Sequence, residues 1–484
     1  MTSSSSRAPG APWWRERSVW AAFTVALLLR LVIVFAVNHP FSGGLEYGYL
    51  LGALSMASGE GLLQHTQDVA PEFAPDSVAM RREAAGGRVD AAHPYPRSTR
   101  GYLPATLHPP GYSLLLWAFY AVGNFTGMVT LVRLTSALLD AWVCVLLFLF
   151  VRDLFGPAPA RMASWVWAFL PAPIIILLNY YPDAFVCFFS ALVLWLASTT
   201  RRGGLAAWAA TGAAVGLAFY FRPEFLSWPA VIALCAWIGS GRFWRTLAGA
   251  AVLGVTLLLV LAPWLWWTGH VAGRPMLGTS SAGGSMYEAL GEDAANPWGV
   301  TLKDAWVEQD AHRHGFATAW YPPADVFYRR LFWRSVREHP GAWVRTLVAH
   351  RLPLALIPRY EFPGRDQDFF AEYQRREGLT RWQVVRRHPG AVLRERAGSL
   401  LLLIVSILLA AAPVVAAVLR RRQWREAAWL VLPWLFVVAV MALVKQVEWR
   451  NVVGTRVVQA AAAGIVLESI RRGRRPAPRA AVRE

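Results

Sequence analysis

Long apolar runs separated by short basic loops dominate this chain of 484 residues. A helix that crosses the hydrocarbon core of a bilayer needs about 20 mostly apolar residues, and several of the runs approach that length. The pattern predicts about ten membrane-spanning helices, at 18–38, 129–151, 162–179, 184–199, 205–221, 225–239, 246–267, 397–419, 426–444 and 452–469. The expected fold class is an all-α polytopic membrane protein.

Two long polar segments interrupt the apolar runs, at 39–128 and at 268–395. The first contains residues 46–61, whose apolar positions recur at helical spacing and predict an amphipathic helix on the membrane surface. Residues 64–100 are polar and rich in Pro, Arg and Ala, so we expect an irregular chain there. The second segment carries several tryptophans among its charged residues. So long a stretch without a span predicts a lid or a small domain.

The apolar stretch at 111–125 is an exception, because it is short for a membrane crossing. Counting it as a crossing would move the basic residues at 201–202 and 420–422 to the outer face. We therefore predict that it forms a helix that lies in, or dips into, the outer leaflet.

Composition and charge agree with membrane insertion. Hydrophobic residues make up 56% of the chain and charged residues 16%, and the formal net charge is +18. Much of the positive charge lies in short loops, as in inserted helices whose basic loops stay in the cytoplasm. The basic loop residues are Arg152, Arg161, Arg201, Arg202, Arg242, Arg245 and Arg420 to Arg422. Ten spans then place both termini in the cytoplasm and both polar segments outside.

The same reasoning divides the chain into parts. Residues 1–17 are expected to form a disordered cytoplasmic arm, and the basic tail 471–484 to rest against anionic headgroups. Between them lie an N-terminal membrane module at 18–267, the outer segment 268–395, and C-terminal helices at 396–470. The abundance of Ala, Arg and Trp suggests the inner membrane of a bacterium. The inserted pattern of positive charge makes nucleic acid an unexpected partner.

Three cysteines, Cys144, Cys187 and Cys235, each lie inside an apolar run. Their spacing fits neither a disulfide framework nor a metal site, so we expect small buried hydrophobes. No histidine cluster or carboxylate triad requires a metal. We expect no metal ligands and no required cofactor, although a divalent cation is compatible with the chemistry described next.

Residues suited to chemistry gather at the predicted outer face, where the apolar runs begin or end. Glu46 and Tyr49 follow the first span, His108 opens the sequence His-Pro-Pro-Gly-Tyr, and Asp183 begins the fourth span. Further charged residues at this face are Arg222, Glu224, Glu448 and Arg450. Carboxylates can act as bases and guanidiniums can bind anions, so we expect any chemistry of this protein at this face.

In their order along the chain, these motifs resemble those of GT-C glycosyltransferases that use lipid-linked sugars. This broad group contains protein O-mannosyltransferases and the aminoarabinose transferase that acts on lipid A. The resemblance covers about 18–267 and 425–470, whereas 268–395 agrees only in position and length. It is carried by Glu46 with Tyr49 and Ala53, by His-Pro-Pro-Gly-Tyr at 108–112, by Arg133 with Ser136 and Ala137, by Tyr181-Pro-Asp183, and by Glu448 with Arg450.

The resemblance implies a GT-C-like bundle and an integral-membrane glycosyltransferase. Such an enzyme moves a sugar from a polyprenyl-phosphate donor to an acceptor hydroxyl or amine on the outer face, with inversion. It implies Glu46 as the catalytic base and Asp183 as a second catalytic carboxylate that orients the acceptor. Arg222 and Arg450 would neutralise the departing phosphate. The implied substrate-binding set is completed by Tyr49, His108 and Glu448.

One position departs from the family pattern. The family usually carries an aspartate, often followed by glutamate, and this chain has Leu45 at the aspartate position. Glu46 is then the carboxylate closest to the helix start. Other carboxylates of the same loop are alternatives if the loop folds back, namely Asp68, Glu72 and Asp76. The expected partners are membrane lipid, a polyprenyl-phosphate-linked sugar, and a glycolipid, polysaccharide or protein acceptor.

Two other functions stay open from the sequence: a transporter or flippase of lipid-linked saccharides, and a non-enzymatic envelope assembly factor. Structural explanations also stay open for single residues. Glu46 suits a helix N-terminus, Asp183 suits a helix cap, and the two arginines suit pairs with neighbouring glutamates. Arg30 and Asp140 lie inside spans, where charges are costly, and are expected to pair with each other as a structural contact.

Overall fold

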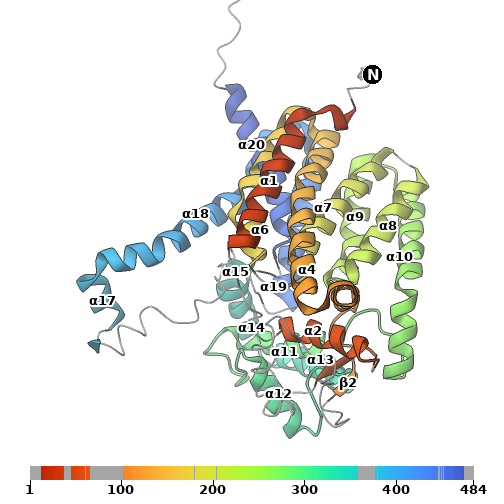
Figure 1. Ribbon diagram of the computed structural model, residues 1–484, viewed down its shortest axis with the longest axis vertical. Helices are drawn as coiled ribbons and strands as arrows, with labels where there is room; N and C mark the ends of the chain where they lie inside the picture. The colour runs from red at the N-terminus through yellow and green to blue at the C-terminus, as the bar shows by residue number, and fades with distance from the viewer. Residues whose placement is uncertain are drawn as a thin grey trace, which may run out of the picture.

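The computed structural model describes residues 12–36, 45–59, 61–65, 102–178, 180–202, 204–357, 377–378, 380–444, 447, 450 and 452–473. Its helices form a bundle with a small domain at one end (Figure 1). Within these residues, six helices are long and apolar enough to cross a membrane. The protein is therefore an all-α, multi-pass membrane protein, as the apolar runs predict.

Each predicted span coincides with helix in the bundle. The bundle helices are α1 (Arg17–Ala36), α4 (Gly111–Phe155), α5 (Pro157–Phe169), α6 (Pro171–Ile176), α7 (Asp183–Thr199), α8 (Leu205–Phe219), α9 (Trp228–Ser240), α10 (Phe243–Ala272), α18 (Pro389–Leu419), α19 (Trp424–Val444) and α20 (Thr455–Gly473). Short turns join several of them, at η3 (Thr200–Arg202), η4 (Pro223–Ser227) and η7 (Arg421–Gln423). The predicted span at 162–179 is interrupted, because Leu170 is extended and Pro171, which lacks an N–H, starts a new helix.

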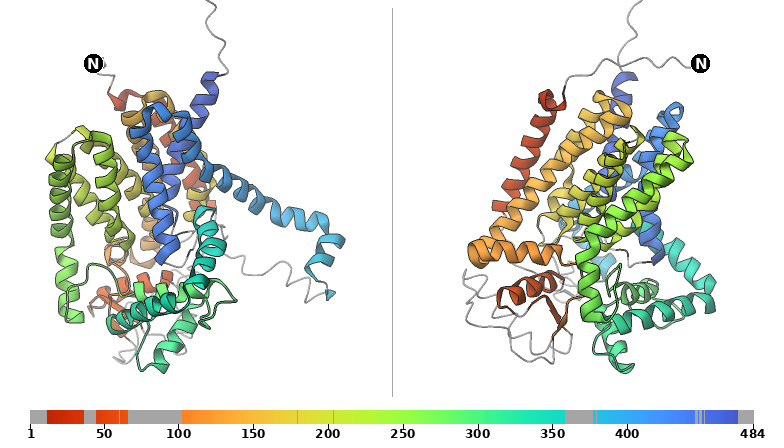
Figure 2. Two further views of the ribbon diagram at one scale, coloured as in Figure 1. Left: turned by 180° about the vertical axis from the view of Figure 1, so that it is seen from behind. Right: turned by 90° about the vertical axis from the view of Figure 1, so that its right-hand side faces the viewer.

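α4 consists of two helices that differ in direction. Gly123 and Asn124 have non-helical backbone angles, and Asn124 has a positive φ of 56°. The part before this kink runs across the end of the bundle, whereas the part after it runs along the bundle (Figure 2). The apolar stretch at 111–125 therefore departs from the direction of the spanning helices, as expected for a helix at a leaflet surface.

The core of the bundle lies where α4, α5, α7 and α20 meet. Glycines allow two of its close contacts. A Cβ on Gly464 of α20 would lie 2.4 Å from the backbone nitrogen of Ala163 in α5. A Cβ on Gly212 of α8 would lie 2.4 Å from the backbone oxygen of Leu253 in α10. Membrane helices use small residues in this way to approach closely. The three cysteines are free and buried, as the sequence predicts.

At one end of the bundle, α2 (Leu45–Ala57) packs against the transverse part of α4. Two short strands follow, β1 (Leu63–His65) and β2 (Tyr102–Pro104), which pair antiparallel with Gln64 opposite Leu103. The prediction of an irregular chain over 64–100 is wrong at its start, because Gln64 pairs with a segment beyond that range. Residues 66–100 lie outside the described part of the chain.

The second polar segment contains a small helical domain at the same end (Figure 1). Its elements, which we call the small domain, are α11 (Ala282–Glu288), η5 (Ala289–Glu292), α12 (Asp304–Arg313), α13 (Pro322–Glu338), α14 (Pro340–Thr346), η6 (Leu347–Arg351) and α15 (Leu352–Leu356). Leu290, Tyr328 and Phe332 are fully buried in an apolar core of its own. This core is separate from that of the bundle, against which Ala355 of α15 packs.

Two further elements lie at the margins of the molecule. η1 (Trp13–Arg15) precedes α1. α17 (Arg381–Arg387) is capped by Thr380, whose side chain accepts a hydrogen bond from the backbone N–H of Gln383. Together with the first part of α18, α17 projects sideways from the bundle (Figure 2). The helix that contains the predicted span at 397–419 thus starts earlier, at Pro389.

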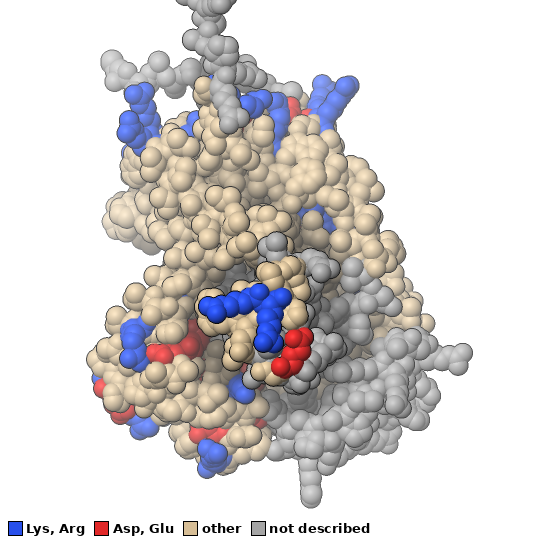
Figure 3. Space-filling view, turned by 90° about the vertical axis from the view of Figure 1, so that its left-hand side faces the viewer, with Lys and Arg blue, Asp and Glu red and all other residues tan. Residues whose placement is uncertain are grey.

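Charge is distributed unevenly along the bundle. Figure 3 shows Lys and Arg gathered at the upper end, a wide band with few charged side chains below it, and both signs of charge on the lower part. The upper end contains the start of α1 and the junctions α4–α5, α7–α8, α9–α10 and α18–α19, which carry the predicted basic loops (Figure 1). We call this the arginine-rich end, and the opposite end, with α2 and the small domain, the loop end.

Candidate functional site

Asp183 and Arg222 form an ion pair at the loop end of the bundle. Asp183 is the first residue of α7 and is fully buried, and its Oδ1 lies 2.5 Å from Nη2 of Arg222. Arg222 stands in the extended link between α8 and η4, where its Nη1 lies 3.6 Å from Oε1 of Glu224. The guanidinium therefore bridges two carboxylates from different segments.

Arg450 reaches the same place from the link between α19 and α20. Its guanidinium carbon lies 4.7 Å from the centre of the Tyr181 ring, two residues before Asp183. A cation over an aromatic face is stabilised by about 0.5–2 kcal/mol. The ring thus holds the second guanidinium near the Asp183–Arg222 pair, and both arginines act electrostatically on Asp183.

Tyr49 of α2 joins this group from a third direction. Its ring stacks on His108, with ring centres 4.7 Å apart, and meets Tyr112 edge-on at 5.2 Å. Burial raises the pKa of Tyr49 to about 12, and the charges of Arg222 and Asp183 act on the hydroxyl as well. The hydroxyl therefore stays protonated at neutral pH and can donate a hydrogen bond to a ligand.

The sequence His-Pro-Pro-Gly-Tyr positions the start of α4 against the site. Gly111 donates its N–H to the backbone oxygen of Tyr220 at 2.9 Å, and a Cβ on Gly111 would lie 2.5 Å from that oxygen. A larger residue would have to push the two segments apart. Tyr112 donates its hydroxyl to the backbone oxygen of Tyr180 at 3.0 Å. These bonds connect the start of α4 to the links that precede η4 and α7.

Two pockets open beside these residues. The first pocket has a volume of about 440 Å³, part of it open to solvent, and Arg222 and Arg450 line one side of it. Apolar residues of α7, α9 and α19 line much of the rest, namely Val186, Trp228, Val437, Val440 and Met441. The polar residues Ser190, Glu224 and Ser227 line it as well. Two guanidiniums can grip phosphate oxygens through their planar N–H groups, and the apolar residues suit a hydrocarbon chain.

The second pocket, of about 400 Å³, is lined by Tyr49 and His108 together with β1 and the segment before α4. Gly48, Gln64 and Leu107 belong to its lining. Tyr49 and His108 therefore form part of a wall that a second molecule could contact. The first pocket combines charge with apolar surface, whereas this one is bounded mainly by α2, β1 and the segment before α4.

A buried polar junction holds the segment that forms this wall. Gln64 Oε1 accepts hydrogen bonds from the backbone N–H groups of Thr106 at 2.6 Å and Leu107 at 2.7 Å. Its Nε2 donates to the backbone oxygen of Trp320 in the small domain at 3.1 Å. Ser280 donates its N–H to the oxygen of Thr106 at 2.9 Å and its hydroxyl to that of Trp320 at 2.7 Å. The small domain is thus bonded directly to the wall of the second pocket.

The small domain also contacts the link that carries Arg450. Glu292 Oε1 accepts a hydrogen bond from the backbone N–H of Val447 at 2.8 Å. The buried Arg351 lies 3.5 Å from the other oxygen of Glu292. One ion pair of the small domain therefore holds a backbone position three residues before Arg450.

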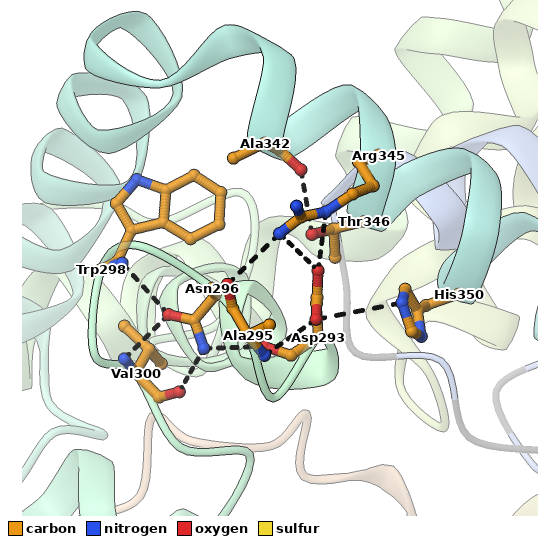
Figure 4. Close-up of polar contacts among 9 residues, drawn as sticks. All are labelled: Asp293, Ala295, Asn296, Trp298, Val300, Ala342, Arg345, Thr346 and His350. Carbon is orange, nitrogen blue, oxygen red and sulfur yellow. Dashed lines mark hydrogen bonds and ion pairs between the residues drawn. The ribbon is translucent and has the colours of Figure 1, made fainter.

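Figure 4 shows how the chain next to Glu292 is fixed. Asp293 accepts hydrogen bonds from the backbone N–H of Ala295 at 2.9 Å and from Nε of Arg345 at 3.0 Å. His350 lies 4.0 Å from the same carboxylate. The N–H of Ala295 and the charge of Arg345 hold the pKa of Asp293 below its ordinary value, so the carboxylate stays ionised at neutral pH. This anchor joins the end of η5 to α14 and η6.

The predicted site residues that the structure brings together are Tyr49, His108, Asp183, Arg222 and Arg450. Glu46 belongs to α2, three positions before Tyr49, but its side chain lies outside the described part of the chain. Glu448 and the alternatives Asp68, Glu72 and Asp76 also lie outside it. Sequence reasoning missed Gln64 and Glu292, because a single polar residue in an element as short as β1 or η5 belongs to no periodic pattern that indicates its partner.

No metal site stands out among these residues. In the described ranges, no three or more His, Cys, Asp or Glu side chains lie together in a group that could hold a metal ion. The charged groups that converge at the loop end are Arg222, paired with Asp183 and Glu224, and Arg450, which lies over the ring of Tyr181. This arrangement suits the binding of an anion by hydrogen bonds and charge.

Comparison with known proteins agrees with the resemblance drawn from the motifs. Residues 107–267, about a third of the chain, match a protein-family model described as dolichyl-phosphate-mannose-protein mannosyltransferase. The matched segment begins just before His108 and contains Asp183 and Arg222. A search of curated proteins found no match.

Solved structures show the fold. The archaeal oligosaccharyltransferase AglB from Archaeoglobus fulgidus, in complex with an inhibitory peptide and a dolichol-phosphate, has a TM-score of 0.50 and 12% identity over 96% of this chain and 51% of that chain. The apo form from the same organism has a TM-score of 0.50 and 12% identity over 96% and 52%. ArnT from Cupriavidus metallidurans bound to undecaprenyl phosphate matches with a TM-score of 0.36 and 13% identity over 96% and 78%. The fold is GT-C-like, and the chain spans about half the length of the archaeal chains.

Proposed function

We propose that this protein is an integral-membrane glycosyltransferase that moves a sugar from a polyprenyl-phosphate donor to the hydroxyl or amine of an acceptor. The first pocket carries the proposal, because its lining combines the guanidiniums of Arg222 and Arg450 with apolar residues of α7, α9 and α19. A phosphate attached to a long hydrocarbon chain has the matching chemistry. The dolichol-phosphate bound by the archaeal oligosaccharyltransferase is a molecule of this kind, and the mannosyltransferase family model covers one of the two arginines.

The proposed reaction is a single displacement at the anomeric carbon of the sugar. The acceptor oxygen or nitrogen forms a bond to this carbon while the bond to the phosphate oxygen breaks, and the phosphate leaves with the bonding electrons. One displacement inverts the configuration of the carbon. Arg222 and Arg450 stabilise the negative charge that develops on the phosphate, which is usually the largest catalytic contribution in such reactions.

The acceptor proton passes to a carboxylate, which we assign to Glu46. Glu46 stands three positions before Tyr49 on α2, and residues at this spacing share a face of a helix. Asp183, held by Arg222, is the second carboxylate and orients the acceptor. The remaining substrate-binding residues of the scheme are Tyr49, His108 and Glu448. The scheme requires no cofactor and is compatible with a divalent cation on the phosphate.

We place the site on the outer face of a bacterial inner membrane. The arginine-rich end then lies in the cytoplasm, where basic residues next to spans prefer to stay. The acceptor, a glycolipid, polysaccharide or protein, would reach the second pocket beside the small domain. The direct bonds between the small domain and the wall of that pocket support this route.

Undecaprenyl phosphate is a suitable probe because it contains the carrier lipid without the sugar. We expect the purified full-length protein to retain it in native mass spectrometry, and both Arg222→Gln and Arg450→Gln to lose most of the bound lipid. Arg386→Gln, which removes an exposed arginine from α17, serves as the matched control. Equal retention by the parent protein and by both site variants would sink the proposal.

The transferred sugar and its acceptor can be found from the cell envelope. We expect cells without the gene, and cells that carry Glu46→Gln, to lack the same glycan signal in mass spectrometry. The flippase alternative makes a different prediction, since a flippase would move a lipid-linked sugar across vesicle membranes without transferring it. Lipid movement without transfer by the purified protein would replace the enzyme proposal with that alternative.

A further inference from the structure

The small domain is bonded to the backbone that carries Arg450. Glu292, the last residue of η5, accepts a hydrogen bond from the backbone N–H of Val447 at 2.8 Å, three residues before Arg450. Arg450 lines the first pocket together with Arg222. We propose that Glu292 is a positioning residue, which holds Arg450 in place for the phosphate of a polyprenyl phosphate. This inference rests on the proposed function, because it takes the first pocket as the phosphate site.

The two sides of Arg450 are held by different parts of the molecule. After Arg450, the backbone N–H of Val453 donates to the carbonyl oxygen of Arg450 at 3.3 Å. Gly454 lies so close to α7 that a Cβ on it would be 2.8 Å from Oγ of Ser190. Before Arg450, the hydrogen bond from Val447 goes to the small domain instead. The bundle therefore fixes the chain that follows Arg450, and the small domain fixes the chain that precedes it.

The hydrogen bond to Glu292 acts over a short stretch of chain. An extended chain advances at most about 3.3–3.6 Å per residue, so the backbone of Arg450 lies within about 11 Å of that of Val447. The side chain of Val447 packs against the core of the bundle. Loss of the bond to Glu292 would give the link more conformations, and ordering it again would add to the cost of binding a ligand. The bond thus prepares Arg450 before the lipid arrives.

Arg351 holds the Glu292 carboxylate in turn. Nε of Arg351 lies 3.5 Å from Oε2 of Glu292, and the two side chains are 0% and 3% exposed. Burial lowers the pKa of the Arg351 guanidinium, and the charge of Glu292 opposes this shift. Arg351 is the last residue of η6, and both η6 and α15 pack against α19. The carboxylate is therefore fixed by the part of the small domain that lies against the bundle.

The backbone of Glu292 is anchored on both sides. Leu290 of η5 is fully buried in the core of the small domain. Asp293 follows Glu292 directly, and its carboxylate accepts a hydrogen bond from Nε of Arg345 at 3.0 Å (Figure 4). Glu292 stands between these two fixed residues, so its side chain reaches Val447 from a defined backbone.

The test compares two double variants that both remove the ion pair. Glu292→Leu/Arg351→Met also removes the acceptor for the N–H of Val447, whereas Glu292→Gln/Arg351→Met keeps an oxygen there. Hydrogen exchange of the purified full-length proteins is followed by mass spectrometry without added lipid. We expect peptides that contain residues 447–450 to exchange faster in the first double variant than in the second, because a hydrogen-bonded segment opens less often. Peptides from α20 should exchange equally in both.

Titration with undecaprenyl phosphate, followed by native mass spectrometry, gives the affinity of the same proteins. We expect the Glu292→Leu double variant to bind the lipid about threefold to tenfold more weakly than the Glu292→Gln double variant, a common range for residues of one hydrogen-bond network. In the Arg450→Gln background this difference should vanish, because Glu292 acts through Arg450. The single variants Glu292→Leu and Glu292→Gln give the same comparison if the double variants do not yield monodisperse protein.

Glu308 provides a matched control in the same domain. Its side chain is also 3% exposed, and it accepts a hydrogen bond from the backbone N–H of Ala319 at 2.9 Å, within the small domain. Glu308→Leu should lower the melting temperature. The affinity for undecaprenyl phosphate and the exchange of the 447–450 peptides should stay within about twofold of the parent protein, as for independent sites.

The possible failures are distinguishable. A parent protein that does not bind undecaprenyl phosphate would overturn the proposed function. In a parent that binds it, equal affinity or equal exchange of the two double variants would show that the bond to Val447 does not position Arg450. The same loss of affinity in the Arg450→Gln background, or in Glu308→Leu, would assign the effect to the stability of the small domain and overturn the role of Glu292.

Discussion

Within the described part of the chain, two arginine–aspartate pairs with a fully buried aspartate differ in their surroundings. Arg30 of α1 and Asp140 of α4 lie 2.5 Å apart inside the bundle, and this confirms the pairing expected for two charges within spans. Arg222 and Asp183 also lie 2.5 Å apart, at the loop end. Both aspartates are fully buried. Distance and burial of the carboxylate therefore do not separate a structural pair from a pair at a candidate site.

The surroundings of the two guanidiniums do separate the pairs. Arg30 has no exposed surface, and it also donates to the backbone oxygens of Ala168 at 2.6 Å and Trp167 at 3.1 Å. The side chain of Arg222 is 12% exposed and lines the first pocket. Protein groups surround the first pair, whereas the second presents its charge to a space that a ligand can enter. A buried ion pair indicates a binding site when a pocket adjoins it.

The largest effect on stability is expected from breaking the structural pair. Arg30→Met leaves the Asp140 carboxylate unpaired in the bundle, which costs about 3–5 kcal/mol in comparable buried pairs. We expect a large fall in melting temperature, with sugar transfer per folded molecule unchanged. The double variant Arg30→Met/Asp140→Leu removes both charges and should regain most of the stability. A stable Arg30→Met protein that has lost transfer would contradict the structural interpretation.

Breaking the pair at the site should affect activity more than stability. We expect Arg222→Gln to lower the rate of sugar transfer about 100-fold or more, because in the proposed reaction it removes one preorganised donor to the leaving phosphate. Its melting temperature should fall less than that of Arg30→Met, because water can reach the first pocket. Arg222→Lys keeps the charge without the planar fork, so its transfer rate should lie between those of the parent protein and Arg222→Gln. If Arg222→Gln transferred sugar at the parent rate, the Arg222–Asp183 pair would be structural, like the Arg30–Asp140 pair.

Arg450 allows the comparison to be sharpened, because it lines the same pocket and its guanidinium lies over the ring of Tyr181. We expect Arg450→Gln to weaken the binding of undecaprenyl phosphate about tenfold, or about 1.4 kcal/mol. Tyr181→Leu keeps the guanidinium but removes the ring beneath it, and its effect should be smaller. Titration followed by native mass spectrometry measures both. A larger effect from Tyr181→Leu would mean that the ring contacts the ligand directly.

Gln64 combines features of both pairs, because protein groups satisfy its side chain and it also lines the second pocket. Gln64→Met leaves the N–H groups of Thr106 and Leu107 without this acceptor, at a cost of about 1–3 kcal/mol. We expect a small fall in melting temperature and a transfer rate lower by about threefold to tenfold. Gln64→Glu keeps the acceptor oxygen and should stay closer to the parent. Identical behaviour of the two variants would show that the hydrogen bonds do not matter.

Much of the bundle could be predicted because membrane insertion depends on neighbouring residues. A run of about 20 apolar residues is enough to predict a span, and backbone hydrogen bonds inside a helix need no distant partner. The kink at Asn124 was not predicted as such, although the short apolar stretch before it was recognised as separate. The pairing of Gln64 with Leu103 was missed, since neither strand is long enough to show alternation and the partner lies far along the chain.

The candidate site likewise has features that the sequence predicts and features that it does not. Motif positions and residue types were enough to single out Asp183, Arg222 and Arg450 before their arrangement was known. The contact between Arg222 and Asp183, and the ring of Tyr181 beneath Arg450, depend on how α7, η4 and the α19–α20 link pack together. A sequence pattern describes neighbouring residues only, so it does not predict contacts between segments that are far apart in the chain.

Local composition is thus sufficient to predict the spans and the gathering of arginines at the arginine-rich end. It also predicts which kinds of residue lie at the loop end. Packing was needed to establish that Arg30 is enclosed by backbone oxygens, whereas Arg222 lines a pocket. The physical reason is the distance along the sequence over which each effect acts. The free energy of inserting a helix into a membrane is a sum over consecutive residues, whereas an ion pair or a pocket exists only where separate helices meet.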